Sequence, residues 1–341
     1  MLPDPIKAHF AAQAEACRTM GSPFTARLLE LVAEALPESA FAARIAGWAG
    51  DPRDDALALR VAGGLNALAM SGRVPAFTAA YPPADGPDAE TLAAAIRAED
   101  GFLAAFLNSA PQTNETARSA VLLGGLLHVA AKTGLEIELL EIGASVGLNL
   151  IPDRYRYELG AGRVWGDAAA RPVIASDWRG AIPPLDAPLR IGGRAGVDLN
   201  PVDPALRPAP LLAYVWPDQA ARVARMKAAL DALAATRWRV ETGDAAAWIA
   251  ARLARPQAEG VARVVTHTVM WSYLPAATRA AIDASFAEAG ARATMARPLG
   301  RLSVEMDAET GSAAVDLTLW PGGARRRLGR SCFHGSWAEW A

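Results

Sequence analysis

Residues 137–151 read IELLEIGASVGLNLI, a mostly apolar run that passes into a glycine turn. The run IELLEI (137–142) is typical of a buried strand in a parallel sheet. Gly143, Ser145 and Gly147 predict a tight turn whose backbone can approach a ligand closely, since glycine carries no Cβ. The same letters, GASVG, also fit the turn that presents the nucleophilic serine of a hydrolase. The rest of the chain has to distinguish between the two.

The bulk composition predicts a folded protein without a strong charge bias. Of its 341 residues, 52% are hydrophobic and 21% are charged, which is enough for a substantial core. The formal net charge of −2 argues against general binding to nucleic acid or to anionic membranes, because both favour a positive excess. No recognisable signal peptide or membrane span is expected, and the two cysteines lie far apart. We therefore expect a cytoplasmic globular protein, and the sequence leaves its oligomeric state open.

The first 135 residues predict helices almost exclusively. Ser22 and Pro23 form a typical helix start, and apolar residues then recur at helical spacing. The last helix of this part is expected to begin after Pro111 and to end near Gly134. We therefore predict a helical N-terminal domain over residues 1–135.

From residue 136 onward, strands and helices alternate. After the first strand, further strands are expected at 194–199, 237–243 and 262–271, followed by a Gly-rich terminal hairpin. This order predicts an open, doubly wound α/β sheet over residues 136–341. The connection between the first two expected strands is longer than a simple strand–helix–strand unit needs. The surplus segment, about residues 152–192, contains Tyr and Trp residues that predict a β-rich insertion.

Acidic residues stand at the ends of three expected strands, namely Glu141, Asp198 and Asp244. Ligands of open α/β sheets bind beyond the carboxyl ends of the strands. A carboxylate accepts two hydrogen bonds at once, which suits a ribose diol, so these acids predict a site for a nucleoside ligand. Asn149 and Asn200 can add hydrogen bonds to the ligand, although both also suit turns and helix caps.

The order of these motifs resembles the first three motifs of class I S-adenosylmethionine-dependent methyltransferases. The motifs are Glu141-x-Gly143-x-Ser145-x-Gly147, then Asp198 after a valine, then Gly243-Asp244-Ala245. The resemblance covers roughly residues 136–330 and implies a Rossmann-like methyltransferase sheet with S-adenosylmethionine as cofactor. It also implies that the turn and Glu141 hold the methionine end, that Asp198 holds the ribose, and that Asp244 with Ala245 holds the adenine.

Three features depart from the usual pattern of that family. Ser145 replaces the middle glycine, and Pro152 limits the following helix to a short piece. No N-P-P-Y-type motif follows the fourth strand, so an amino group of DNA or protein is a less expected target. More narrowly, the segments EIGASVGLN, PQTNETARS and THTVMWSYL resemble a bacterial family of unknown function that spans the whole chain.

Two further segments carry candidate catalytic and substrate-binding residues. In PQTNETAR, Asn114, Glu115 and Arg118 either orient an acidic substrate or form a capped helix start with a solvated ion pair. His267 follows an apolar strand and is a candidate general base, unless it is a strand-end histidine bound by backbone. Trp271 and Tyr273 are expected to line the same pocket.

These residues predict methyl transfer from S-adenosylmethionine to a small molecule, with no metal ion, nucleic acid or membrane as partner. One alternative is a non-catalytic nucleotide- or metabolite-binding protein of the same fold. The other is a serine hydrolase in which Ser145 acts with Asp244 and with His267 or His334. Helices stand where the hydrolase fold needs strands before the nucleophile, which disfavours that alternative. The scattered His and Cys residues lack the spacing of a zinc site.

Overall fold

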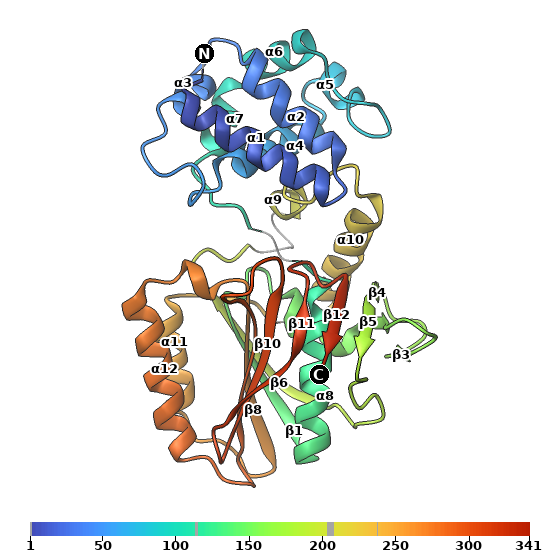
Figure 1. Ribbon diagram of the computed structural model, residues 1–341, viewed down its shortest axis with the longest axis vertical. Helices are drawn as coiled ribbons and strands as arrows, with labels where there is room; N and C mark the ends of the chain where they lie inside the picture. The colour runs from blue at the N-terminus through green and yellow to red at the C-terminus, as the bar shows by residue number, and fades with distance from the viewer. Residues whose placement is uncertain (1, 113–114, 203–207, 237) are drawn as a thin grey trace. The chain divides into compact units, whose positions relative to one another are not determined.

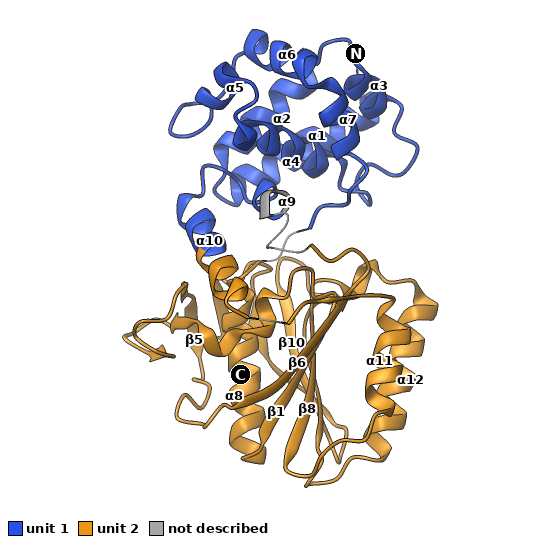
Figure 2. Ribbon diagram, turned by 180° about the vertical axis from the view of Figure 1, so that it is seen from behind, with its two compact units in different colours: residues 1–113, 207–227 blue, residues 114–206, 228–341 orange. Residues whose placement is uncertain are grey.

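The computed structural model describes residues 2–112, 115–202, 208–236 and 238–341, which form two compact units (Figure 2). The first unit comprises residues 1–113 and 207–227, and the second comprises residues 114–206 and 228–341. The predicted boundary at residue 135 therefore differs from the observed one. A helix before the sheet belongs with the sheet, and a segment of the C-terminal half belongs with the N-terminal helices, because packing rather than chain order defines a compact unit.

The first unit is helical. Its helices are α1 (Asp4–Thr19), α2 (Pro23–Ala35), α3 (Ala40–Ala46), α4 (Leu57–Ser71), α5 (Pro75–Ala79), α6 (Ala89–Ala98), α7 (Asp100–Phe106), α9 (Pro208–Ala213) and the first part of α10 (Ala220–Ala234). Asn66 of α4 is buried and donates from Nδ2 to the carbonyl oxygens of Ala213 (2.9 Å) and Val215 (3.0 Å). These bonds fasten the segment after α9 to the N-terminal helices.

The start of α2 also depends on a residue far along the chain. Pro23 is its first residue, as expected, but Ser22 makes no capping bond with its own side chain. Instead the carboxylate of Asp218 accepts hydrogen bonds from the Ser22 hydroxyl (2.6 Å) and from the N–H of Phe24 (3.0 Å). The cap is therefore supplied by the same C-terminal segment that completes the helical unit.

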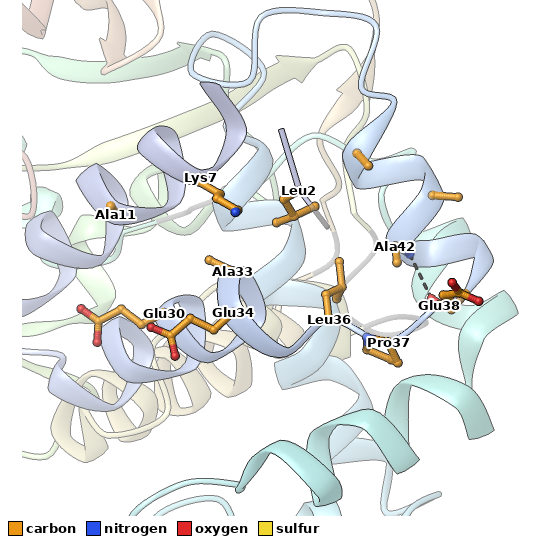
Figure 3. A pocket seen from close by; sticks show the side chains of 13 residues that line it. Leu2, Lys7, Ala11, Glu30, Ala33, Glu34, Leu36, Pro37, Glu38 and Ala42 are labelled. Atoms are coloured by element: carbon orange, nitrogen blue, oxygen red, sulfur yellow. Dashed lines mark hydrogen bonds between the residues drawn. The ribbon is translucent and has the colours of Figure 1, made fainter. Parts of the chain in front are cut away.

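The helical unit contains a cavity of about 630 Å³ among α1, α2 and α3 (Figure 3). Its walls are largely small apolar side chains, and Lys7, Glu30 and Glu34 bring charge to its edge. Glu30 is already paired with Arg18 at 2.6 Å. Part of the charge at this edge is therefore balanced within the unit.

The second unit is built on a nine-stranded mixed sheet, formed by described residues in the order β5-β12-β11-β10-β9-β8-β1-β6-β7 (Figure 1). Its strands are β1 (Glu136–Ile142), β5 (Asp177–Gly180), β6 (Ile191–Asp198), β7 (Glu241–Thr242), β8 (Val261–Thr268), β9 (Leu299–Met306), β10 (Ala313–Trp320), β11 (Arg325–Ser331) and β12 (Trp337–Trp340). Strands β7-β6-β1-β8-β9 are parallel, β9 to β12 form an antiparallel meander, and β5 runs parallel to β12. The protein is thus a mixed α/β structure with a large, mostly parallel central sheet.

Helices cover both faces of this sheet (Figure 2). Helix α8 (Arg118–Thr133) lies on one face, and α11 (Ala245–Ala254) and α12 (Ala276–Ala291) lie on the other. A Cβ at Gly125 would overlap Leu302 of β9, and one at Gly124 would lie 2.7 Å from Trp178. The two glycines let α8 approach the sheet closely, which is why this helix belongs to the second unit rather than to the helical one.

Between β1 and β6 the chain forms short pieces of structure. Two single turns of 3-10 helix, η1 (Leu148–Leu150) and η2 (Pro152–Arg154), follow the glycine turn in place of a full helix. The segment expected to be β-rich forms β2 (Arg156–Glu158), β3 (Val164–Trp165) and β4 (Val173–Ala175), which make a small separate sheet, and then β5 at the edge of the main sheet. Within the described ranges, no helix is both long and apolar enough to cross a membrane.

Candidate functional site

The turn after β1 adopts left-handed backbone at three alternating positions. The φ angles are +68° at Gly143, +51° at Ser145 and +91° at Gly147. A left-handed conformation is easy for glycine but costs a serine on the order of 1 kcal/mol or more. Asp198, at the end of β6, offsets this cost because its Oδ2 accepts a hydrogen bond of 2.8 Å from the N–H of Ser145. Its Oδ1 accepts another, of 3.0 Å, from the N–H of Asn200.

This turn lies where the order of the parallel strands reverses direction. From β1 the chain adds β6 and β7 on one side, and then β8 and β9 on the other. The connections therefore leave in opposite directions from the carboxyl end of β1, which is where open α/β sheets hold their ligands. The acids expected at the strand ends, Glu141 and Asp198, do lie at this edge.

Glu141 is almost fully buried, with 1% of its surface exposed. Burial raises the pKa of its carboxyl group to about 8, against the opposing effects of a hydrogen bond from Asn149 and the positive charge of Arg118. The nearby charge of Asp198 raises the pKa further. At neutral pH the carboxyl group is therefore mostly protonated, and a positive charge brought next to it would favour its ionised form.

Three buried side-chain oxygens near the turn lack a hydrogen-bond partner among the residues that the structure describes. They are Glu141 Oε2, Ser145 Oγ and Asn149 Oδ1. A buried polar atom without a partner costs about 1–3 kcal/mol, so native proteins rarely keep three together without a bound water or ligand. A ligand that satisfies the amide oxygen of Asn149 must carry a hydrogen-bond donor, whereas the Ser145 hydroxyl can donate or accept.

Arg118 and Glu115 lie at the start of α8, and both are buried, with 7% and 3% of their surfaces exposed. The alternative of a solvated ion pair is therefore wrong. Arg118 donates from Nε to the carbonyl oxygen of Phe333 (2.6 Å) and from Nη1 to Thr268 Oγ1 (3.4 Å). Glu115 Oε1 accepts a bond of 3.1 Å from the N–H of Ala117. Asn114, the third residue of this group, lies outside the described residues.

His267 lies on the opposite face of the sheet from Glu141. Glu141 pairs with Thr266 in the register of β1 and β8, and successive side chains of a strand point to opposite faces. His267 is 1% exposed, its Nδ1 lies 2.7 Å from Glu305 Oε1, and its Nε2 accepts a bond of 3.1 Å from Arg301 Nε. These contacts describe a neutral ring with its proton on Nδ1, and burial lowers its pKa.

Of the remaining predicted residues, Tyr273, Asp244 and Asn200 are exposed to solvent. Tyr273 is 72% exposed, whereas Trp271 stacks on His267 with ring centroids 5.1 Å apart. Asp244 is exposed and caps α11, accepting a bond of 2.9 Å from the N–H of Ala247. Asn200 is exposed, and Ala245 is buried in the first turn of α11. The structure thus brings Glu141, Ser145, Asn149 and Asp198 together, but not His267 or Tyr273.

Protein side chains cover the turn at both of its glycines. A Cβ at Gly143 would lie 3.0 Å from Met270, and one at Gly147 would lie 2.6 Å from Trp238. The open space lies beside the turn instead, in a cavity of about 230 Å³. Its lining residues come from the turn, from α10 and from the segments next to β6 and β7: Val146, Pro201, Val202, Leu233, Trp238, Arg239, Val240 and Thr242.

The catalytic triad of the hydrolase alternative is not assembled. Ser145 Oγ has no hydrogen-bond partner within the described part of the chain. Both nitrogens of His267 are engaged by Glu305 and Arg301, and Asp244 caps a helix. Among the described residues, no hydrogen bond therefore links the Ser145 hydroxyl to a general base.

The sequence analysis missed the partners of His267. Glu305 also accepts bonds from the N–H groups of Met270 and Trp271, and Arg301 pairs with Asp283 at 2.6 Å. The detectable signal was the pair of charged residues Arg301 and Glu305, which stand four positions apart, and so on one face, in the otherwise mostly apolar strand β9. Across the described residues, no group of three or more His, Cys, Asp and Glu side chains is placed to hold a metal ion.

The sequence was also compared with known proteins. The model of a family described as "Uncharacterized protein conserved in bacteria (DUF2332)" matches residues 7–340. No curated protein and no solved structure matches the chain.

Proposed function

The chain belongs to the DUF2332 family, and we propose that it is a methyltransferase that binds S-adenosylmethionine at the carboxyl end of β1. The observation that carries this proposal is the group of three buried, unpartnered oxygens on Glu141, Ser145 and Asn149. S-adenosylmethionine presents an ammonium group with three donors and a sulfonium with a positive charge. Both features suit a buried acid whose ionisation is held back mainly by burial.

A Rossmann-like fold is part of the proposal. The parallel strands run in the order β7-β6-β1-β8-β9, with the reversal at β1 that is typical of doubly wound sheets. Each oxygen of Asp198 accepts one backbone hydrogen bond and retains a lone pair, so the same carboxylate can still receive the two hydroxyl groups of a ribose. The motif resemblance assigned the ribose to this residue.

The cavity beside the turn is the proposed place of the adenine. Trp238, Val240 and Val202 give it flat and branched apolar walls, which suit a heteroaromatic ring. Its volume of about 230 Å³ is below the roughly 300–1,000 Å³ of typical ligand pockets. The cavity therefore serves the nucleoside part, and the methionine part extends toward Glu141.

The sulfonium of S-adenosylmethionine is already activated for methyl transfer, so the protein mainly aligns the acceptor and excludes water. His267 would have to lose its bond from Arg301 before its Nε2 could accept a proton. We therefore assign the site residues to binding and alignment, and assign no proton transfer to His267.

Titration calorimetry with S-adenosylmethionine and S-adenosylhomocysteine tests the proposal. We expect binding to the wild type and at least tenfold weaker S-adenosylmethionine binding to Glu141→Gln, because the neutral amide cannot pair with the ammonium group. Glu136→Gln is the matched control, since Glu136 is exposed at the other end of the same strand. Folding of each variant is verified by circular dichroism.

The possible results separate the candidate functions. Binding followed by methyl transfer in a panel of small-molecule acceptors supports the enzyme. Binding without product across the panel supports a metabolite-binding protein that uses the same site. If the protein is folded and neither ligand gives a heat of binding, the cofactor assignment is contradicted.

A further inference from the structure

A second polar cavity lies at the opposite edge of the sheet from the glycine turn. Its volume is about 340 Å³, and it lies between the C-terminal ends of α11 and α12 and the first residues of β8 and β9. The two ends of β8, Val261 and Thr268, are roughly 23 Å apart at about 3.3 Å per residue. This cavity is therefore separate from the candidate cofactor site.

The lining of this cavity is basic. Four arginines contribute to it, Arg255, Arg263, Arg292 and Arg297, and none of its lining residues is acidic. The other walls are apolar, with Leu253 and Leu299 as their largest side chains. A guanidinium group binds phosphate or carboxylate through two parallel hydrogen bonds, so this lining favours an oxyanion.

One of the four arginines has a structural role. Arg263 is 5% exposed, pairs with Glu138 at 2.7 Å, and donates from Nη1 to the carbonyl oxygens of Arg252 (3.2 Å) and Arg255 (3.1 Å). It therefore caps the C-terminal end of α11, where carbonyl groups otherwise lack partners. Its guanidinium is therefore held in place, with its charge paired to that of Glu138.

The other three arginines are held weakly. Arg292 pairs with Glu288 one helical turn away, and both side chains are more than half exposed. Arg297 lies 3.8 Å from Glu259, again with both side chains largely exposed, and Arg255 is exposed. Exposed ion pairs of this kind contribute about 0–1 kcal/mol, so a bound oxyanion can displace the glutamates at little cost.

We propose that this cavity binds a small molecule with at least two anionic groups, such as a phosphate ester, a polyphosphate or a polycarboxylate. Arg255 and Arg297 contact the anionic groups, and the apolar walls contact the remainder of the ligand. The volume lies in the range of about 300–1,000 Å³ that is typical of small-molecule pockets. A ligand there acts as an effector and not as a methyl acceptor, because the cavity lies at the far edge of the sheet from the glycine turn.

Calorimetric titration of the full chain with tripolyphosphate, pyrophosphate and citrate tests this proposal. We expect at least one of the three to bind at low ionic strength and to bind more weakly as salt is added. The double variant Arg255→Ala, Arg297→Ala should weaken that binding at least tenfold. Both side chains are largely exposed, so the variant should keep the melting temperature of the wild type within a few degrees.

The matched control is the double variant Arg154→Ala, Arg326→Ala, which removes the same charge from exposed arginines outside the cavity. It should bind the anion within twofold of the wild type. Preference for the phosphates over citrate would identify a phosphorylated ligand, and the reverse would identify a polycarboxylate. Equal weakening in both double variants, or no binding of any of the three anions, would overturn the proposal.

Discussion

Asp198 Oδ2 accepts a hydrogen bond of 2.8 Å from the backbone N–H of Ser145, so the end of β6 holds the turn that follows β1. The two residues are 53 positions apart in the chain. Through this bond, the acid that the motif resemblance assigns to the ribose also supports a serine with positive φ. If the ligand binds as proposed, the same carboxylate serves both binding and the stability of the turn.

Replacement of Asp198 by alanine should destabilise the protein by about 1.5–3 kcal/mol, because hydrogen bonds to a charged acceptor are worth that much. Asp198→Asn keeps an oxygen that can accept from Ser145 and should lose less than half as much. Urea unfolding of the three proteins, followed by far-ultraviolet circular dichroism, measures both values. Equal losses for the two variants would show that the bond to Ser145 contributes little.

Glu141→Gln should change the pH dependence of stability in the ligand-free protein. The folded state keeps the Glu141 proton up to a pKa of about 8, whereas the unfolded chain releases it near the model value of 4.5. The contribution of Glu141 to the free energy of unfolding is therefore fully present below its pKa in the unfolded chain. It is lost as the pH rises toward its pKa in the folded protein. Relative to the wild type, the glutamine variant should melt several degrees higher at pH 8 than at pH 5.

Thermal melts between pH 5 and pH 8 provide this comparison, with Glu136→Gln as the control. Glu136 is exposed, so its variant should keep a constant difference from the wild type at every pH. A constant difference for Glu141→Gln as well would mean that Glu141 is ionised in the folded protein at neutral pH.

If S-adenosylmethionine binds as proposed, its binding should release a proton near neutral pH. The ammonium group pairs with ionised Glu141, which is a minor species below pH 8. The apparent affinity should rise about tenfold between pH 6 and pH 7, since it scales with the ionised fraction. An α-amino group, with a pKa of about 7.7–8.0, stays mostly protonated in that range.

Calorimetry in two buffers of different ionisation enthalpy counts the released protons. The wild type should release close to one proton per ligand at pH 7, and Glu141→Gln should release none. An affinity for S-adenosylmethionine that does not vary between pH 6 and pH 7 would remove Glu141 from the ammonium site without excluding the ligand itself.

The burial of His267 is expected to lower the free energy of unfolding at acid pH. Burial lowers the pKa of His267, so the unfolded chain takes up a proton below pH 6.5 that the folded state does not bind. Each pH unit below 6.5 therefore costs about 1.4 kcal/mol until the folded pKa is reached. Urea unfolding at pH 7.5, 6.5 and 5.5 measures the free energy of unfolding. This free energy should fall more steeply with decreasing pH in the wild type than in His267→Gln. Parallel losses in the two proteins would mean that another group controls the acid limit.

Gly147→Ala should destabilise the protein more than Gly162→Ala. Both glycines have positive φ, but a Cβ at Gly147 would lie 2.6 Å from Trp238, whereas one at Gly162 would meet no atom within 4 Å. The difference of about 1–3 kcal/mol should report the crowding alone, because the backbone strain is shared. If Trp238→Ala brings the Gly147→Ala cost down to that of Gly162→Ala, the crowding is confirmed.

Local patterns in the sequence determined much of the second unit. The apolar run before Gly143 forms β1, and the acids Glu141 and Asp198 lie at the carboxyl edge of the sheet. Pro152 breaks the expected helix after the turn into two single turns of 3-10 helix. These features depend on a residue and its close neighbours in the chain, so periodicity and turn chemistry are sufficient to predict them.

Other features are decided by partners that lie far away in the sequence. The side of the sheet to which a strand residue points depends on strand register, and the register of β1 with β8 separates His267 from Glu141. Trp238 and Met270 cover the turn glycines from distant segments, which no turn motif reveals. The strand predicted at 237–243 is also shorter in the structure, since among the described residues of this segment (238–243) only Glu241–Thr242 pairs with β6.

The sequence by itself determined which residue types stand at the ends of the strands and that a glycine turn follows β1. Only the tertiary structure decided which of those residues share a face, which are buried and which oxygens lack a partner. The physical reason is that backbone conformation depends mainly on local sterics, whereas burial and the pKa of Glu141 depend on atoms brought close by long-range packing.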